Sequence, residues 1–157
     1  MASKTNAARL LETAGIEHRL VEYPTDEDHL DAQTVARSID ADPATVFKTL
    51  VAACDDGEVA VFCVPGSEDL DLKKAAAAAG CDKIHLVPVA RLRGLTGYVR
   101  GGCSPIGMTH SYPTYLDEVA LLFDRIYVSA GRRGLQILIA PADLLEVELV
   151  GLEPPLG

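Results

Sequence analysis

The sequence contains no tryptophan, few aromatic residues and no apolar run long enough to form a membrane-spanning helix. Such a helix needs about 20 consecutive apolar residues, so a membrane protein is excluded. The five tyrosines and three phenylalanines are too few for the broad base-stacking surface of a single-strand-binding protein. Residues 1–6 also lack the apolar stretch of a secretion signal. The sequence therefore predicts a soluble protein of the cytoplasm with no membrane partner.

Cysteine and histidine occur four times each, but never at the spacing of a metal or redox site. Zinc and thioredoxin-like sites place two ligands within a few residues of each other, and no such pair is present. Cys54 and Cys63 lie in apolar runs, where a cysteine is usually a small buried hydrophobic residue. Cys103 lies among glycines and is expected to serve packing. We therefore expect a core that needs no disulfide, and a site with no metal and no cofactor.

Basic residues are outnumbered by acidic ones, 14 against 23, which gives a net charge of −9. Because affinity for nucleic acid comes largely from lysine and arginine at the phosphates, this charge argues against a general nucleic-acid binder and against a DNA partner. The basic residues are unevenly distributed, however, and residues 73–133 carry nine of them against four acidic residues. This segment is either an ordinary solvated surface or one face for an anionic ligand on an acidic body.

The chain is long enough for one domain, because 157 residues, 48% of them hydrophobic, can bury about two-thirds of their surface. Apolar periodicity predicts helices over 5–14, 32–39 and 70–79 and from residue 141. β-rich runs predict strands over 19–23, 46–54, 59–64, 83–87, 98–100, 125–129 and 135–140, and residues 115–123 fit either type. We expect a single domain over residues 1–157 with an α+β fold, a mixed, largely antiparallel sheet with flanking short helices.

Three groups of residues carry candidate chemistry. Lys48 is a lone basic residue in an apolar strand. It lies either on a solvated face or in a pocket, where its ammonium would need an anion or a carbonyl as partner. The paired glycines Gly101 and Gly102 either form a turn or let backbone N–H groups approach a ligand. Arg132 and Arg133, at the tip of the last predicted hairpin, are either solvated or face phosphate.

Four motifs occur together, in the segments 46–50 (VFKTL), 71–74 (DLKK), 96–107 (TGYVRGGCSPIG) and 126–135 (IYVSAGRRGL). In this order and spacing they resemble the YbaK/EbsC family of aminoacyl-tRNA deacylases, over about residues 4–150. The resemblance implies the fold of the domain associated with bacterial prolyl-tRNA synthetase. It also implies a freestanding trans-editing enzyme that hydrolyses the ester of a mischarged tRNA, with tRNA and prolyl-tRNA synthetase as partners.

The resemblance implies roles for several residues. Lys48 matches the indispensable lysine of the family, and Gly101 is expected beside it at the ester. The residues expected to bind substrate around the same pocket are Tyr23, Thr49, Gly102, Ser129 and Gln136. The YbaK branch removes cysteine from tRNA(Pro), and the thiol of the substrate attacks its own carbonyl, so the enzyme needs no nucleophile. This agrees with the lack of any serine, cysteine or metal catalytic pattern in the sequence.

Two departures from the family pattern leave the substrate open. Gln136 stands where several YbaK-type sequences carry an acidic residue that contacts the substrate amine. The acidic segment 25–31 has His29 or Leu30 where some relatives place phenylalanine. The alternatives are a deacylase for another substrate such as Ala-tRNA(Pro), and a noncatalytic module that binds a tRNA acceptor end or a synthetase.

The basic residues of the middle segment are expected to gather around the Lys48 pocket and to contact the acceptor stem of tRNA. Most of them occur as close pairs, which concentrates positive charge and predicts weak, salt-sensitive binding. The expected contacts are Lys73, Lys74, Lys83, Arg91, Arg93, Arg100, Arg132 and Arg133.

Overall fold

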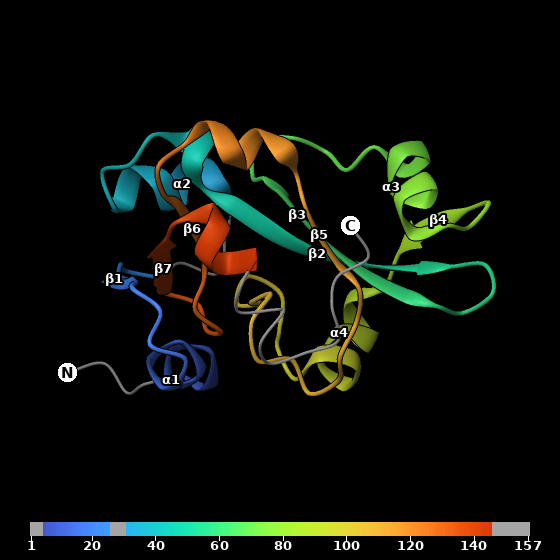
Figure 1. The fold of residues 1–157 in the computed structure, drawn as a ribbon, viewed down its shortest axis with the longest axis horizontal. Coiled ribbons are helices and arrows are strands. Elements are labelled where there is room, and N and C mark those ends of the chain that lie inside the picture. The colour runs from blue at the N-terminus through green and yellow to red at the C-terminus, as the bar shows by residue number, and fades with distance from the viewer. Residues whose placement is uncertain (1–4, 26–30, 146–157) are drawn as a thin grey trace.

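The computed structural model describes residues 5–25 and 31–145, in which short helices and 3-10 turns surround two β-sheets (Figure 1). In chain order the elements are α1 (Asn6–Thr13), β1 (Arg19–Glu22), α2 (Ala32–Ser38), η1 (Pro43–Thr45), β2 (Phe47–Cys54), β3 (Val59–Pro65), α3 (Leu72–Ala79), β4 (Ile84–Leu86), α4 (Val89–Thr96), β5 (Thr114–Leu116), η2 (Glu118–Leu122), β6 (Ile126–Ser129) and β7 (Leu135–Ile139). Residues 141–145 are also helical. The predicted α+β class is confirmed. His29 and Leu30 lie outside the described residues.

The strands form two sheets that meet at the start of β2. In one sheet β7 lies between β1 and β6 and pairs antiparallel with both. In the other the order is β4-β2-β3-β5, antiparallel except for the parallel pair β3 and β5. A parallel bridge between Val46 and Tyr127 places β6 beside the beginning of β2. The predicted mixed, largely antiparallel pairing is therefore correct, but it is divided between two sheets.

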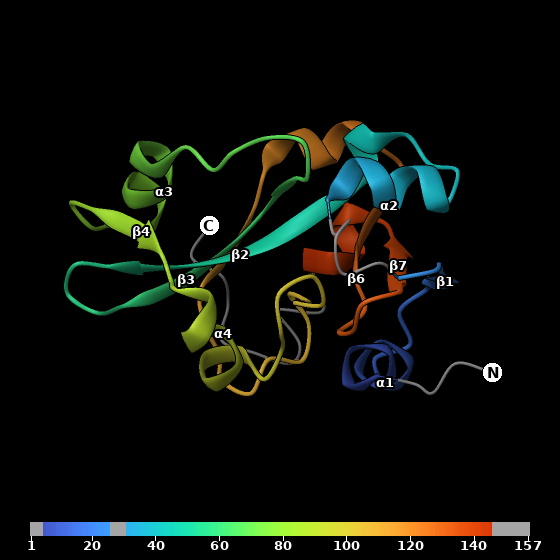
Figure 2. The ribbon, with the colours of Figure 1, turned by 180° about the vertical axis from the view of Figure 1, so that it is seen from behind.

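The helices α3 and α4 cover opposite faces of the β2–β3 hairpin, as two opposite views show (Figures 1 and 2). Successive side chains of a strand point to opposite faces of its sheet. Accordingly, Ala52 of β2 packs with Ala76 of α3. Val51, one residue earlier, packs with Leu92 of α4 and with Met108 of the loop that follows α4. The two faces therefore have separate cores, one under each helix.

α3 begins and ends where its local sequence predicts. The carboxylate of Asp71 accepts hydrogen bonds from the backbone N–H groups of Lys73 and Lys74, at 3.0 and 3.1 Å. Gly80 ends the helix in the left-handed conformation, with φ +77°. Five alanines between these caps supply high helix propensity. No helix in the described parts of the chain is both long and apolar enough to cross a membrane.

Three segments differ from their predictions. α4 itself was not predicted, since Gly94 interrupts its pattern and no side chain caps its start. Residues 98–100 are not a strand, because the backbone turns there and the N–H of Gly102 donates to the carbonyl of Val99 (3.0 Å). Residues 115–123 are neither one helix nor one strand, since β5 and η2 divide them.

Cys54 is buried, as predicted, but it also forms a disulfide with Cys81, which was not predicted. The two residues are 27 positions apart, and their Cα atoms are separated by 6.2 Å. Cys54 ends β2 and Cys81 follows α3, so the bridge ties the end of α3 to the hairpin. Tertiary packing alone brings these two residues together. Cys63 and Cys103 are buried outside any disulfide.

Candidate active site

A cavity of about 940 Å³ lies beside an open edge of β2. One edge of β2 pairs with β3 along its length. On the other edge β6 contacts only the beginning of the strand, and β4 pairs only with Ala52–Cys54. The cavity occupies the gap between these neighbours. Of the residues predicted for the site, it is lined by Tyr23, Lys48, Thr49, Gly101, Ser129 and Gln136.

The backbone of β2 directs some of its N–H and C=O groups into this gap. Gly66 donates to the carbonyl of Val46 across the β3 side (2.8 Å), whereas Val87 donates to the carbonyl of Val51 on the opposite side (3.0 Å). In an antiparallel ladder alternate residues direct both backbone groups to the same neighbour. Thr49 has the same parity as Val51, so its N–H and C=O face the open edge. No strand in the described parts of the chain pairs with them there.

Lys48 is a half-buried basic residue in the cavity wall. Its side chain makes no hydrogen bond or ion pair with the residues that the structure describes. An ammonium group that loses water contacts without gaining an acceptor is costly, so such a group favours a bound anion or carbonyl oxygen. Apolar side chains make up part of the surrounding lining, and they offer the ammonium no competing acceptor. Of the two interpretations of Lys48, the geometry therefore favours the pocket.

Gln136 contributes an unpaired acceptor to the same cavity. It lies on β7 opposite Ser129 of β6 and Val21 of β1, and its side chain is only 5% exposed. Its Nε2 donates to the hydroxyl of Tyr23 at 3.4 Å, whereas its Oε1 has no hydrogen-bond partner among the residues that the structure describes. A buried polar atom without a hydrogen bond costs about 1–3 kcal/mol. Because Gln136 lines the cavity, a ligand with an N–H or O–H group can supply the missing donor.

The paired glycines have different places. Gly101 lies in the cavity wall with φ +84°, a conformation that favours glycine. Gly102 is buried and is not part of the lining. A Cβ on Gly102 would lie 3.0 Å from both the Cα of Arg132 and the backbone N of Arg133. Its position thus fits a close backbone contact between two loops, rather than the substrate contact that was predicted.

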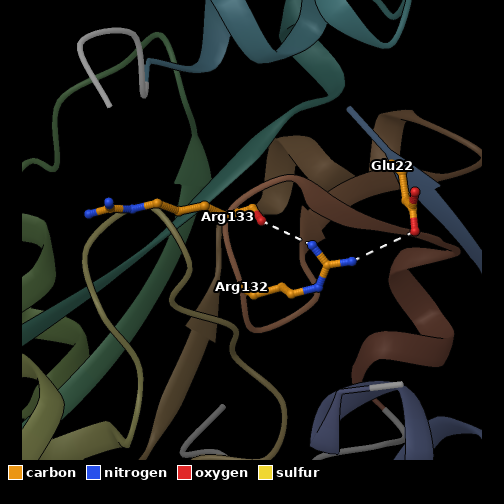
Figure 3. Close-up of polar contacts among 3 residues, drawn as sticks. All are labelled: Glu22, Arg132 and Arg133. Atoms are coloured by element: carbon orange, nitrogen blue, oxygen red, sulfur yellow. Dashed lines mark hydrogen bonds and ion pairs between the residues drawn. The ribbon is translucent and has the colours of Figure 1, made fainter. Parts of the chain in front are cut away.

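The two arginines at the hairpin tip bind the protein itself (Figure 3). One guanidinium N–H of Arg132 donates to the carbonyl of Arg133 (3.3 Å), and its Nη2 lies 3.7 Å from the carboxylate of Glu22. The side chain of Arg133 leaves in the opposite direction, and its Nε donates to the carbonyl of Arg100 (2.9 Å). These contacts attach the hairpin tip to β1 and to the loop that carries Gly101.

The prediction that all the basic residues gather around one pocket is wrong. Lys73 and Lys74 begin α3, whereas Arg91 and Arg93 belong to α4 on the opposite face of the hairpin (Figures 1 and 2). Arg100 is the member of the predicted set that lines the cavity. The basic residues are close together along the chain, but they are separated in space because α3 and α4 cover opposite faces of the β2–β3 hairpin.

Cys103 is part of the wall but is poorly suited to be a nucleophile. Burial raises the pKa of its thiol to about 11, even though a hydrogen bond with Thr96 lowers it. The thiol is therefore protonated at neutral pH, and only the thiolate is strongly nucleophilic. Within residues 5–25 and 31–145, no group of three or more His, Cys, Asp or Glu side chains is arranged to hold a metal.

Sequence reasoning missed the apolar wall of the cavity, which comes from the end of β4 and from α4. Leu86, Val87, Val89 and Leu92 line this part. The three-residue spacing of Val89 and Leu92 was the available signal, because such positions share one side of a helix. That signal was weak in a helix of eight residues that contains a glycine.

Comparison with known proteins gives three agreements. The model of the aminoacyl-tRNA editing domain family matches residues 26–147. The chain is 44% identical over 144 residues to EbsC of Enterococcus faecalis (strain ATCC 700802 / V583), a protein provisionally named Cys-tRNA(Pro)/Cys-tRNA(Cys) deacylase; the match covers 92% of this chain and 88% of EbsC. A crystal structure provisionally described as a trans-editing enzyme for prolyl-tRNA synthetase superposes with a TM-score of 0.80 at 28% identity, covering 97% of this chain and 96% of that one.

Proposed function

Since the chain belongs to the aminoacyl-tRNA editing domain family, we propose that it is a trans-editing enzyme that hydrolyses the ester bond of mischarged tRNA, with Cys-tRNA(Pro) as its main substrate. The similarity to EbsC supports this choice of substrate. The observation that carries the proposal is the half-buried Lys48, which has no partner among the described residues and lies at an open strand edge in the cavity. A tRNA terminus offers this ammonium both an ester carbonyl and a phosphate.

In the proposed reaction the substrate supplies its own nucleophile. The cysteine thiol loses its proton and its sulfur attacks the ester carbonyl carbon. The bond from that carbon to the ribose oxygen then breaks, and the oxygen takes up a proton, which leaves a thiolactone that water opens to cysteine. Lys48 and the backbone beside Gly101 hold the carbonyl oxygen while negative charge develops on it, and a donor in such a position contributes about 2.7–4 kcal/mol.

Gln136 and Tyr23 are proposed to hold the other end of the aminoacyl group. The unpaired Oε1 of Gln136 accepts a hydrogen bond from the α-ammonium of the substrate. Tyr23 is already linked to the Nε2 of the same amide, which fixes the orientation of the side chain. Ser129 shapes the wall next to Gln136, and its hydroxyl is engaged by the N–H of Gly131 (3.2 Å). An amide oxygen keeps its acceptor character at every pH at which the ester survives.

The test of the site is deacylation of Cys-tRNA(Pro) by Lys48→Ala. We expect kcat/KM to fall at least about 100-fold, because the donor at the developing charge is lost. Lys83→Ala is the matched control, since Lys83 is an exposed lysine just before β4 and outside the cavity lining. A fully active Lys48→Ala variant alongside a folded wild type would overturn the proposed role.

A panel of Cys-, Ala-, Ser- and Pro-tRNA tests the substrate. Release of cysteine alone, or fastest, is the expected result. Cleavage of Ala-tRNA(Pro) while Cys-tRNA(Pro) persists would contradict the thiol-assisted reaction and leave a deacylase of different specificity. Tight binding of the acceptor end without release of any amino acid would instead establish the noncatalytic alternative. Adding prolyl-tRNA synthetase to the same assay shows whether that protein delivers the tRNA.

A further inference from the structure

One continuous stretch of this acidic protein contains no acidic residue. Residues 83–116 include Lys83, Arg91, Arg93 and Arg100 but no aspartate or glutamate, although the whole chain carries a net charge of −9. This stretch builds β4, α4, the following loop and β5. α4 and its loop cover one face of the β2–β3 hairpin. The fold therefore converts a stretch of sequence into one positively charged region of the surface.

This region borders the cavity and presents apolar groups at its edge. Leu86 and Val89 line the cavity, yet their side chains remain 48% and 60% exposed. Residues four apart are neighbours on a helix surface, so Arg93, an exposed residue outside the cavity lining, lies one turn after Val89 on α4. Arg100 lines the cavity from the loop after α4. Two aliphatic side chains and the guanidinium group of Arg100 thus border one side of the opening, and Arg93 lies next to Val89 on the same helix.

We propose that this α4 surface, made of Leu86, Val89, Arg93 and Arg100, binds the single-stranded 3′ end of the tRNA; the inference rests on the proposed function. The terminal nucleotides must lie at the cavity mouth when the ester is at Lys48. Aliphatic groups pack against the flat faces of nucleobases, and guanidinium groups pair with phosphate oxygens. Neither arginine makes a side-chain contact that competes for its guanidinium within the described residues.

The other basic residues are less suited to this ligand. Lys73 and Lys74 lie on the opposite face of the hairpin, under which a separate core is packed. Arg132 and Arg133 already bind Glu22 and loop carbonyls. The acidic residue of the described lining is Asp31, whose carboxylate caps α2 by accepting from the N–H of Thr34. The α4 surface is therefore the side of the opening from which a polyanion can approach.

The test compares two double variants with the same change of charge on opposite faces. The ligand is an RNA hairpin with a single-stranded CCA end that carries no amino acid. Its binding is measured for Arg93→Ala/Arg100→Ala and for Lys73→Ala/Lys74→Ala over a range of salt concentrations. We expect the first pair to weaken binding at least tenfold at low salt and to make the log–log salt slope shallower by about 1.4, the value for two phosphate contacts to a single strand. The second pair is expected to bind like the wild type.

The outcomes distinguish failure of the proposed RNA-binding surface from failure of the proposed hydrolysis. Equal effects of the two pairs, an unchanged Arg93→Ala/Arg100→Ala variant, or a wild type that does not bind the hairpin at low salt would each overturn the α4 surface. Selective loss in the α4 pair by a protein that releases no amino acid would support the surface and contradict the proposed hydrolysis. Circular dichroism of each variant verifies that the fold is intact. Lysine in place of alanine at position 93 should restore part of the binding that Arg93→Ala loses, because it restores the charge.

Discussion

The two faces of the β2–β3 hairpin differ in how they are built. On the α3 side, an aspartate cap, an alanine-rich helix, a glycine terminator and the bridge between Cys54 and Cys81 all favour the same structure. On the α4 side, a helix without a side-chain cap leads into a glycine-rich loop that borders the cavity. Strong local signals therefore mark the face that stabilises the domain, and weak ones mark the face that forms the site.

The difference has a physical basis. A helix that serves only to cover a sheet gains from every favourable local choice, since nothing else is required of it. The loop that borders the cavity holds an unusual backbone conformation, φ +84° at Gly101, and such a loop depends on distant groups for support. We therefore expect damage on the α3 side to lower stability without changing catalysis, and damage on the α4 side to change catalysis.

The largest effect on the α3 side is expected from the disulfide. Replacing both Cys54 and Cys81 by alanine, or reducing the wild type, should lower the free energy of unfolding by about 3.5 kcal/mol, the chain-entropy value for a loop of this length. Urea unfolding with and without a dithiol reductant measures it. The reductant should leave the double variant unaffected, and deacylation by the folded protein should not change. Loss of activity with retained stability would contradict the separation of the two faces.

The next largest effect is expected from a substitution of Thr96, on the α4 side. Its buried hydroxyl donates to the carbonyl of Leu92 (2.9 Å) and accepts from the N–H of Tyr98 (3.0 Å). Thr96→Val keeps the shape but leaves that N–H unpaired, which should cost about 2 kcal/mol in the free energy of unfolding and lower deacylation. Thr13→Val, at an exposed position that ends α1, is the control. Equal behaviour of the two valine variants would refute the role of this contact.

Gly102→Ala tests the close contact between the cavity loop and the hairpin tip. The added Cβ would lie 3.0 Å from backbone atoms of Arg132 and Arg133, so one loop must move by a few tenths of an ångström. We expect kcat/KM to fall about tenfold, because misplacing groups that orient a substrate is costly. Gly94→Ala is the matched control, since nothing lies within 4 Å of the new methyl group and the residue is helical. It should be as active as the wild type.

The smallest effect is expected at the start of α3. Asp71→Ala removes the cap of the helix and should cost about 1 kcal/mol in the free energy of unfolding. Asp69→Ala, two residues earlier and exposed, has no capping role and should be neutral. Thermal unfolding and deacylation are measured for both. A change in kcat with Asp71→Ala would show that the two faces communicate.

Much of the fold could be predicted because its signals are local. The strands β2 and β3, the hairpin of β6 and β7, and the helix α3 were all predicted to within a few residues. α4 and its loop were not, since Gly94 and the glycines at 97, 101 and 102 weaken any local pattern. Their structure depends instead on side-chain contacts across the loop, such as the hydroxyl of Tyr98 on the carbonyl of Ile106 (2.6 Å).

The candidate site was predictable in part. Lys48 was singled out by its contrast with the apolar strand around it, and Tyr23, Ser129 and Gln136 came only from resemblance to a family. No pattern in the sequence shows that these residues border one cavity, because they lie on four different strands or their ends. The open edge at Thr49, in particular, depends on where β6 and β4 stop pairing with β2.

The sequence by itself determined the class of the fold, most of its strands, the caps of α3 and the uneven distribution of charge. Each of these depends on residues close together in the chain. Tertiary structure alone decided which basic residues share a face, which cysteines pair, and that Gln136 has an unpaired oxygen beside Tyr23. The physical reason is that packing places helices that follow each other in the chain on opposite faces of a sheet, and brings residues that are distant in the chain within contact distance.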